Sequence, residues 1–244
     1  MIPKIIHYCW FGRGEMSPLA KRCIQSWKKY LPDYQIMEWN EENFNLDLYP
    51  YAREAYDHNK YAFVADVCRL YALYTVGGIY MDTGVEVVKS YDPFLHHSAF
   101  SGYETDKVTT GIIGSEKGGE WARHNLEYYS GRHFIMPDGK MDQTVNVVTI
   151  CNYMDTLGFR HDGSYQDFPG IITVYPWDFF CPKSYYDGVI RSTDNTVAIH
   201  HFEGSWHSRS EIYWYRIKKS VLRSGLYGLL MKVRQGLRNL VFRG

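Results

Sequence analysis

The sequence has few cysteines, and their spacing makes no metal or disulfide site. The five cysteines are an odd number, lie far apart in apolar segments and include no CxxC pair. This pattern favours reduced thiols over a disulfide framework or a zinc site. It is typical of a protein that resides in the cytoplasm.

Several other signals are also missing. No run of 18 apolar residues occurs, and the start of the chain, MIPKIIHYCWFG, has no long apolar stretch after its lysine, so neither a transmembrane helix nor a signal peptide is predicted. Basic and acidic residues number 27 each, which gives no overall field for nucleic acid. No GxGxxG follows the first predicted strand and no GxxxxGK[ST] occurs, which argues against a Rossmann dehydrogenase and a P-loop kinase.

What is present is enough for one large core. The chain has 244 residues, of which 45% are hydrophobic, and this predicts one main globular domain. Aromatic residues make up 17% and include 22 tyrosines. Such a composition suits a site that stacks on flat rings and sugar faces, although an aromatic-rich core has the same composition.

The order of hydrophobic patterns predicts an α/β fold with a mixed, mostly parallel sheet. The first half reads as strand 5–10, helix 18–30, strand 34–39, helix 61–76 and strand 79–81. The second half adds strands at 85–91, 98–103, 111–114, 171–177 and 197–201, helices at 120–129 and 142–157, and an irregular aromatic loop at 178–186.

The stretch 61–89 organises the rest. Asp66 and Arg69 are three residues apart and share one helix face, and Asp82 ends the strand that follows the Gly77-Gly78 turn. Two interpretations are open. These three residues converge in a cleft, or the first two form a surface ion pair while Asp82 caps a turn.

Polar and aromatic residues at strand ends support the first interpretation. In parallel sheets, ligands bind beyond the carboxyl ends of the strands, where Trp10, Asn40 and Asp82 are predicted to lie. A core tryptophan and a turn-forming asparagine remain alternatives. His200 and His201 end another strand. Together with a carboxylate and an arginine, they are suited to hold a divalent cation and a phosphate ester, which is the chemistry of a sugar nucleotide.

Four segments carry a resemblance to a known family. They are IPKIIHYCWFG at 2–12, AFVADVCRLYALYTVGGIYMDTGVEVVK at 62–89, VYPWDFFCPK at 174–183 and AIHHFEGSW at 198–206. The sequence resembles glycosyltransferase family 32, whose DxD sugar-binding region is shared with fungal mannosyltransferases and, more distantly, with glucosylating toxins. The resemblance implies a GT-A fold, a nucleotide-sugar donor and transfer with retention of anomeric configuration.

The resemblance also implies roles for individual residues. Trp10 stacks on the nucleotide base with Asn40 near it, Asp66 and Arg69 hold the donor sugar, and Asp82 is the first acid of the DxD motif, contacting ribose and metal. Asp66, Arg69 and Asp82 form the catalytic set. Tyr80, Thr83, Ser205 and Trp206 complete the donor site.

The implied metal is Mn²⁺ or Mg²⁺, with Asp82, His200 and His201 as ligands. The chain departs from the DxD pattern because Gly84 stands where the second aspartate is expected. This puts metal dependence in doubt, with Glu86 as a possible substitute.

The last segment of the chain is basic and amphipathic. From residue 211 to 244 there are eight basic residues and one acid, interleaved with leucines. We expect a catalytic domain at 1–210 and a helical segment at 211–244 that binds an anionic membrane surface, although a helix docked on the domain is an alternative.

These features together predict an enzyme of surface polysaccharide synthesis, such as capsule or O-antigen. It is expected to be peripheral on the inner face of the plasma membrane and to extend a lipid-linked oligosaccharide from a UDP-sugar. A GDP-mannose-dependent mannosyltransferase and a catalytically silent sugar-nucleotide-binding subunit are the alternatives. No residue decides the sugar or nucleotide.

Overall fold

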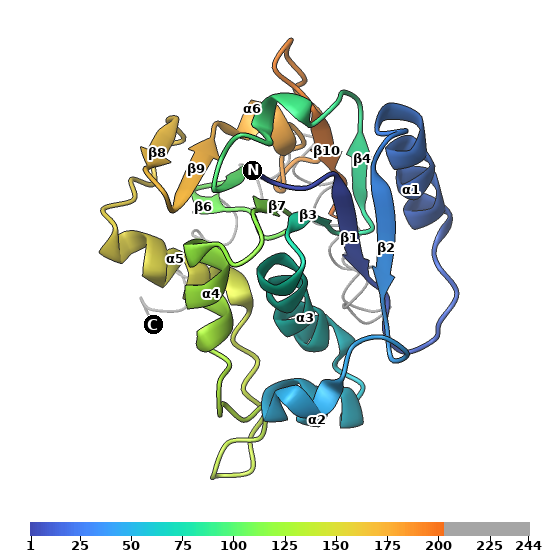
Figure 1. Cartoon of the computed structure of the whole chain (residues 1–244), viewed down its shortest axis with the longest axis vertical. Helices are drawn as coiled ribbons and strands as arrows, with labels where there is room; N and C mark the ends of the chain where they lie inside the picture. Colours follow the sequence, from blue (N-terminus) through green and yellow to red (C-terminus); the bar gives the residue numbers. More distant parts are fainter. Residues whose placement is uncertain (203–244) are drawn as a thin grey trace, which may run out of the picture.

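The computed structural model describes residues 1–202 and consists of one α/β unit around a central sheet (Figure 1). The strands of this sheet run in the order β2-β1-β3-β7-β5-β9-β8, with β6 paired to β5, and β4 and β10 form a separate pair. The main strands are β1 (Ile5–Cys9), β2 (Gln35–Trp39), β3 (Gly78–Met81), β5 (Ala99–Glu104), β7 (Ile112–Ser115), β8 (Gln166–Phe168) and β9 (Ile172–Tyr175). The short ones are β4 (Val85–Val87), β6 (Lys107–Val108) and β10 (Ala198–His200).

The sheet is mixed, as predicted. β1 pairs in parallel with both β2 and β3, and β5 pairs in parallel with β9. β7 lies antiparallel between β3 and β5. Two successive reversals make β5 parallel to β3, so the carboxyl ends of β1, β2, β3 and β5 share one edge of the sheet.

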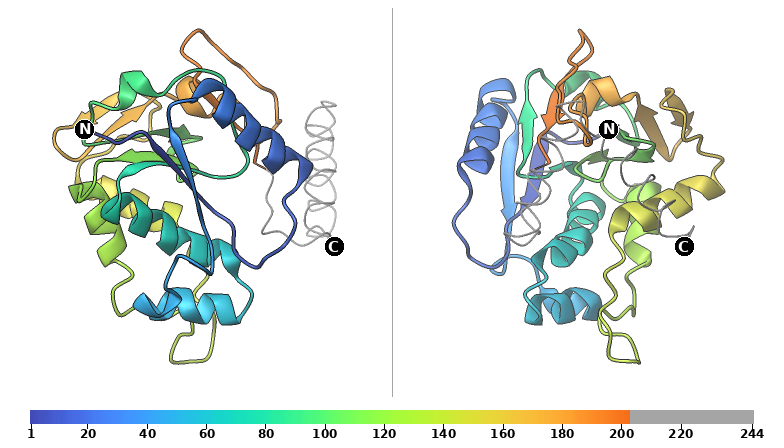
Figure 2. Two further views of the ribbon diagram at one scale, coloured as in Figure 1. Left: turned by 45° about the vertical axis from the view of Figure 1, so that its right-hand side comes forward. Right: turned by 180° about the vertical axis from the view of Figure 1, so that it is seen from behind.

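Helices cover both faces of the sheet. On one face lie α2 (Pro50–Asp57), α3 (Tyr61–Thr75), α4 (Glu120–Glu127) and α5 (Asn146–Thr156), which pack around a core that includes Tyr80 and Tyr103. On the other face lie α1 (Pro18–Tyr30), α6 (Trp177–Phe180) and the β4–β10 pair, with Ile79 and Phe100 in their core. Figure 2 shows α1 flanking β2 and β4. Short 3-10 helices occupy Leu46–Leu48 and Asp92–Phe94.

Local signals explain where the best-predicted helices begin and end. Ser17 caps α1 by accepting the Ala20 N–H at 3.0 Å, and Pro18 occupies the first turn. Gly77 and Gly78 follow α3 with φ of 75° and 128°. A Cβ on Gly78 would lie 2.5 Å from the Ile5 carbonyl oxygen, so this turn requires glycine twice over, for its φ and for its space.

Buried His7 joins the elements beneath this turn. Its Nε2 lies 2.8 Å from the Gly77 carbonyl oxygen, and its Nδ1 accepts the Trp39 Nε1–H at 3.0 Å. Burial lowers the pKa of His7, with the Gly77 hydrogen bond acting in the opposite direction. The neutral ring therefore ties β1 to β2 and to the end of α3.

The second half departs from the sequence prediction in several bounds. The helix predicted at 142–157 begins only at Asn146, because Asp142 is engaged outside a helix by the Arg132 guanidinium and the Thr144 N–H. The strand predicted at 85–91 ends at Val87, and residues 178–186 include part of a short helix, α6. The prediction missed α2, β6 and β8. Among residues 1–202, no helix is long and apolar enough to cross a bilayer.

Candidate donor-binding site at the strand ends

Asp66, Arg69 and Asp82 meet at the shared strand edge. Arg69 Nη2 lies 3.0 Å from Asp66 Oδ1 and 3.7 Å from Asp82 Oδ1. Asp66 is 7% exposed and Arg69 6%, so the pair is buried and not the surface ion pair of the alternative interpretation. The Asp82 side chain is 32% exposed, so Asp82 is the more accessible of the two carboxylates.

Further contacts hold Arg69 in place. Its Nη1 donates to the Thr110 carbonyl oxygen at 2.6 Å, and its guanidinium carbon lies 4.6 Å from the centre of the Tyr80 ring. Tyr80 also donates its hydroxyl hydrogen to Asp82 Oδ1 at 2.8 Å. Arg69 and Tyr80 therefore both contact Oδ1 of Asp82, and its Oδ2 faces His200.

The protonation of Asp66 is set by opposing effects. The pKa of Asp66 is raised to about 6, chiefly by burial and to a smaller extent by the negative charge of Asp82. The charge of Arg69 and the Asn146 N–H, which donates to Asp66 Oδ2 at 3.2 Å, act to lower it. Asp66 is thus ionised near neutral pH only because these two groups compensate its burial.

The two predicted histidines face different neighbours. His200 Nε2 lies 3.8 Å from Asp82 Oδ2, whereas His201 Nε2 lies 2.8 Å from Glu86 Oε2. They alternate at the end of β10, whose register pairs His200 with Val85 and Ile199 with Glu86. The structure therefore places His200 beside Asp82 and His201 on the other side of the strand.

The pKa values of the two histidines shift in opposite directions. Burial disfavours protonation of His200, but the hydrogen bond and charge of Glu104, with the charge of Asp82, outweigh burial and raise its pKa. Burial lowers the pKa of His201, and Glu86 only partly opposes this effect. Protonated His200 thus has two carboxylates as neighbours.

The donor set beside Asp82 fits a hard divalent cation. Carboxylate oxygens and an imidazole nitrogen suit Mn²⁺, and carboxylates suit Mg²⁺. Among the described residues, Glu104, Cys181 and His200 also bring donor atoms within 4.8 Å of one another. Thiolate is a soft ligand, which suits Zn²⁺ or Cu⁺ better than Mn²⁺ or Mg²⁺, so Cys181 does not add to a site for such a metal.

The remaining predicted residues lie along the same edge or outside the described part. Trp10 follows β1 and donates its Nε1–H to the Gly14 carbonyl oxygen at 2.7 Å. Asn40 follows β2 and shapes a turn by accepting the Glu42 N–H at 2.9 Å. Thr83 lies in the turn after Asp82. Ser205, Trp206 and the segment 211–244 fall outside residues 1–202.

Sequence reasoning missed several residues of the site. Glu104 ends β5, Gly111 lies against both Asp82 and His200, and Asn146 begins α5 next to Asp66. The Asn146 Nδ2 is buried and has no hydrogen-bond partner among residues 1–202. A signal for Glu104 existed, because it directly follows a predicted strand.

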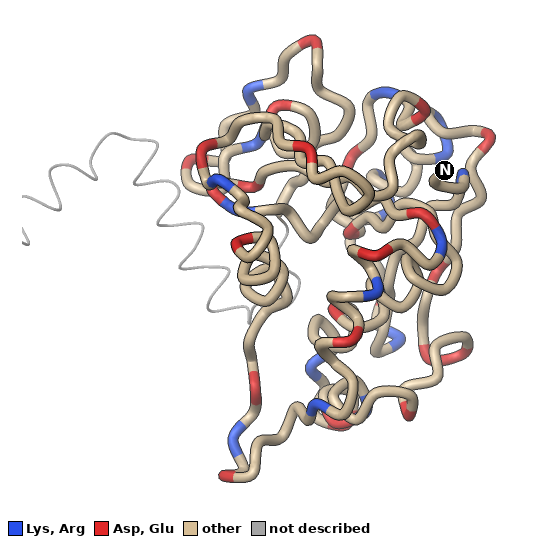
Figure 3. The backbone as a smooth tube through the Cα atoms, turned by 60° about the vertical axis from the view of Figure 1, so that its left-hand side comes forward, with Lys and Arg blue, Asp and Glu red and all other residues tan. Residues whose placement is uncertain are grey.

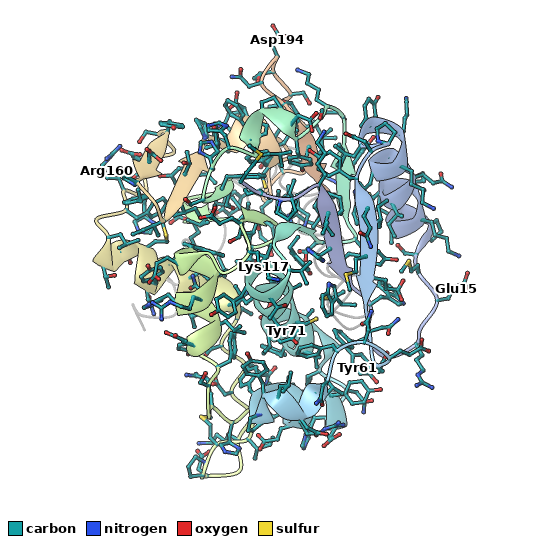
Figure 4. The ribbon with its side chains drawn as sticks, viewed as in Figure 1. Glu15, Tyr61, Tyr71, Lys117, Arg160 and Asp194 are labelled. Carbon is teal, nitrogen blue, oxygen red and sulfur yellow. The ribbon has the colours of Figure 1, made fainter. Side chains whose placement is uncertain are left out.

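Figure 3 shows acidic and basic residues interspersed along the described backbone. Aromatic side chains flank the strand edge: Tyr61, labelled in Figure 4, lies over Gly12, where a Cβ would be 2.3 Å from its Cε2. The fold and site thus define an α/β protein with a compact polar cluster where the sheet ends.

Comparison with known proteins gives a family match for part of the chain. Residues 17–101 match the family described as "Glycosyltransferase sugar-binding region containing DXD motif". This match agrees with the family resemblance in the sequence and includes Asp66, Arg69 and Asp82.

Curated relatives come from Schizosaccharomyces pombe. Inositol phosphoceramide mannosyltransferase 3 is 31% identical over 125 residues, covering 48% of this chain and 34% of that protein. Inositol phosphoceramide mannosyltransferase 2 is 34% identical over 101 residues, covering 40% and 29%. The chain therefore spans about a third of the length of these relatives.

Solved structures with a similar arrangement include two proteins that are named glycosyltransferases. The PaToxG glycosyltransferase matches with a TM-score of 0.48 and 21% identity over 64% of this chain and 70% of that one. The galactosyltransferase LgtC, in complex with donor and acceptor sugar analogues, matches with a TM-score of 0.44 and 14% identity over 90% and 95%.

Proposed function

We propose that this protein transfers a sugar, with retention of configuration, from a nucleotide-sugar donor to a glycan acceptor. The observation that carries the proposal is the buried Asp66–Arg69 pair next to the accessible Asp82 carboxylate, inside the matched family region. Buried, hydrogen-bonded charges are preorganised, and they stabilise developing charge without reorganisation during the reaction.

Each residue has a task in this proposal. Asp66 and Arg69 bind the donor sugar hydroxyls, and Asp82, supported by Tyr80, contacts the ribose and the metal. Thr83 follows in the same turn. Trp10 stacks on the base, with Asn40 nearby, while Ser205 and Trp206 close over the diphosphate.

The metal in this proposal is Mn²⁺ or Mg²⁺. Asp82 and His200 hold it, whereas His201 and Glu86 contact each other on the other side of β10 and do not reach this ion. When bound, the cation neutralises charge on the leaving diphosphate. The residues themselves orient the donor and exclude water from the sugar.

A UDP-sugar is our proposed donor, and GDP-mannose is a second candidate because the yeast relatives are named mannosyltransferases. A thermal-shift panel of UDP, GDP, CDP and dTDP, each with and without MnCl₂, tests this choice. A ligand at 100 times its dissociation constant stabilises by about 2.7 kcal/mol. We expect the shift with UDP, and a shift with GDP alone would replace the UDP proposal by the mannosyltransferase.

A turnover assay with the nucleotide found in this panel separates an enzyme from a silent binding subunit. After the matching nucleotide is known, hydrolysis of its nucleotide sugars is measured with and without glycan acceptors. We expect slow hydrolysis that acceptor accelerates into transfer. Binding without turnover under every condition would instead show a silent subunit.

The acceptor proposal rests on the sequence of the last segment. We propose a catalytic unit at 1–210 and a basic segment at 211–244 that binds an anionic membrane. The acceptor is then a lipid-linked oligosaccharide for a capsule or O-antigen, on the inner face of the plasma membrane. Attachment raises the effective concentration of such an acceptor.

A further inference from the structure

Glu104 is a charged residue of the site that lies outside the DxD region. It is the last residue of β5, and its Oε2 lies 3.4 Å from His200 Nδ1. The other nitrogen of the same ring, Nε2, faces Asp82 Oδ2 at 3.8 Å. One imidazole therefore bridges two carboxylates that are 22 residues apart in sequence.

The surroundings restrict this arrangement. Thr109 donates its hydroxyl hydrogen to Glu104 Oε2 at 2.9 Å, which orients the carboxylate. A Cβ on Gly111 would be 2.9 Å from His200 Cε1 and 3.0 Å from Asp82 Oδ2, so glycine is what allows the ring and the carboxylate to approach. The His200 side chain is 12% exposed, which leaves it little freedom to turn.

We propose that Glu104 is a positioning residue that sets the tautomer of His200. By accepting the Nδ1–H, the carboxylate leaves the Nε2 lone pair directed at the side of Asp82, where a cation is to be bound. Histidine ligands bind metal through one nitrogen while the other donates to a carboxylate, and this second contact fixes ring and tautomer. In the DxD motif of this chain, Gly84 stands in place of the second aspartate. Glu104 thus supplies a second carboxylate to the site.

This inference deepens the proposed function and rests on it for the role of the metal. The contact between Glu104 and His200 is present without metal or donor, so the tautomer can be measured on the protein alone. The two ideas can therefore fail separately, and the experiment measures each.

The variants are Glu104→Ala, which removes the acceptor, and Glu104→Gln, whose side-chain oxygen still accepts a hydrogen bond. Asp155→Asn is the matched control, because it alters another carboxylate–histidine contact, Asp155 Oδ1 to His161 Nε2 at 2.8 Å, on the exposed surface. The folded state of each variant is first verified by its thermal unfolding curve.

The first readout is the ¹⁵N spectrum of the His200 ring in the full chain without metal, at alkaline pH where the ring is neutral. His200→Gln assigns the signal. We expect the Nδ1–H form in the wild type, the Asp155→Asn control and Glu104→Gln, and a population of the Nε2–H form in Glu104→Ala. An Nε2–H ring in the wild type, or an unchanged tautomer in Glu104→Ala, would overturn the proposal.

The second readout is the affinity for MnCl₂ alone, measured by electron paramagnetic resonance. We expect Glu104→Ala to weaken it about 10–100-fold, the usual effect of losing such a contact, and Glu104→Gln to recover part of it. Unchanged affinity in Glu104→Ala would remove the link between Glu104 and the metal. If the wild type binds no Mn²⁺, the metal in the proposed function fails, and the tautomer still decides the role of Glu104.

Discussion

At the scale of single residues, the two carboxylates that flank Arg69 differ in exposure and so in what they contribute. Asp66 is buried and helps to hold the fold, whereas Asp82 is partly exposed and already has Tyr80 and Arg69 around it. From the sequence alone, both acids are expected to be dispensable for stability. The burial of Asp66 restricts that expectation to Asp82.

Replacement of Asp82 by alanine should therefore separate function from stability. We expect Asp82→Ala to reduce donor hydrolysis at least ~100-fold, the scale of losing a preorganised electrostatic contact. Its melting temperature should change little because Arg69 keeps Asp66 as its ion-pair partner at 3.0 Å. Hydrolysis rates and thermal unfolding of the same preparation test this, and a wild-type rate would remove Asp82 from the site.

The raised pKa of Asp66 predicts a pH dependence of stability. The pKa is about 6 in the folded protein, and about 3.9 is the usual unfolded value, so the folded state binds the proton more tightly. The stabilisation from this proton is complete below pH ~4 and is lost as the pH rises through 6.

Urea unfolding of the wild type and Asp66→Asn across this range measures the effect. The stability of the wild type relative to the variant should fall by about 2 kcal/mol between pH 4 and 7, which is most of the effect of a shift of about two pKa units. A difference that does not change with pH would show that Asp66 titrates normally.

The site residues that lie within one short stretch could be predicted from the sequence. Those that are distant in sequence and are brought together by the fold could not. Asp66, Arg69 and Asp82 are within one short stretch, so helix periodicity and the Gly77-Gly78 turn suffice to bring them together. Glu104 and Asn146 reach the same place from β5 and α5. Their proximity depends on the order of strands and on where a loop ends, which local patterns do not contain.

At the scale of elements, the close approach of His200 on β10 to the end of β3 depends on one glycine, which lies just before β7. The Gly111 carbonyl oxygen accepts the Asp82 N–H at 2.9 Å, and its missing side chain makes room for His200. The elements that were predicted best from the sequence have clear boundary signals. An example is the start of α1, which Ser17 and Pro18 mark. α2 begins after Tyr49 without a side-chain cap, which explains why it was missed.

Gly111→Ala should displace the site without breaking the sheet. The new methyl group would lie 2.9 Å from His200 Cε1, and a side chain must shift to admit it. We expect donor hydrolysis to fall roughly tenfold or more, as small misplacements in a catalytic site do. Gly14→Ala is the matched control, since a Cβ there meets nothing within 4 Å. Equal activity of the two variants would argue against a confined His200.

At the scale of the whole molecule, the described residues carry the proposed donor site, while the proposed acceptor depends on the last segment of the chain. Its sequence has eight basic residues and one acid. Each basic residue near an anionic surface contributes about 1 kcal/mol, and salt screens this contribution.

Removal of residues 212–244 tests this division of roles. We expect donor hydrolysis to remain near the level of the full chain and transfer to a lipid-linked acceptor to fall sharply. Binding of the full chain to vesicles should need anionic lipid and weaken at high salt. Loss of donor hydrolysis or unfolding after truncation would show that the segment belongs to the packing of the domain.

The strand that carries His200 also determines when the site forms during synthesis. β10 pairs only with β4 among the described strands, and β4 lies just after Asp82, more than a hundred residues earlier in the chain. Chains emerge from the ribosome with the N-terminal part first. A nascent chain therefore exposes Asp66, Arg69 and Asp82 long before the imidazole arrives. The site is completed only after β10 has been synthesised, so a chain that terminates before His200 retains the acids without their histidine.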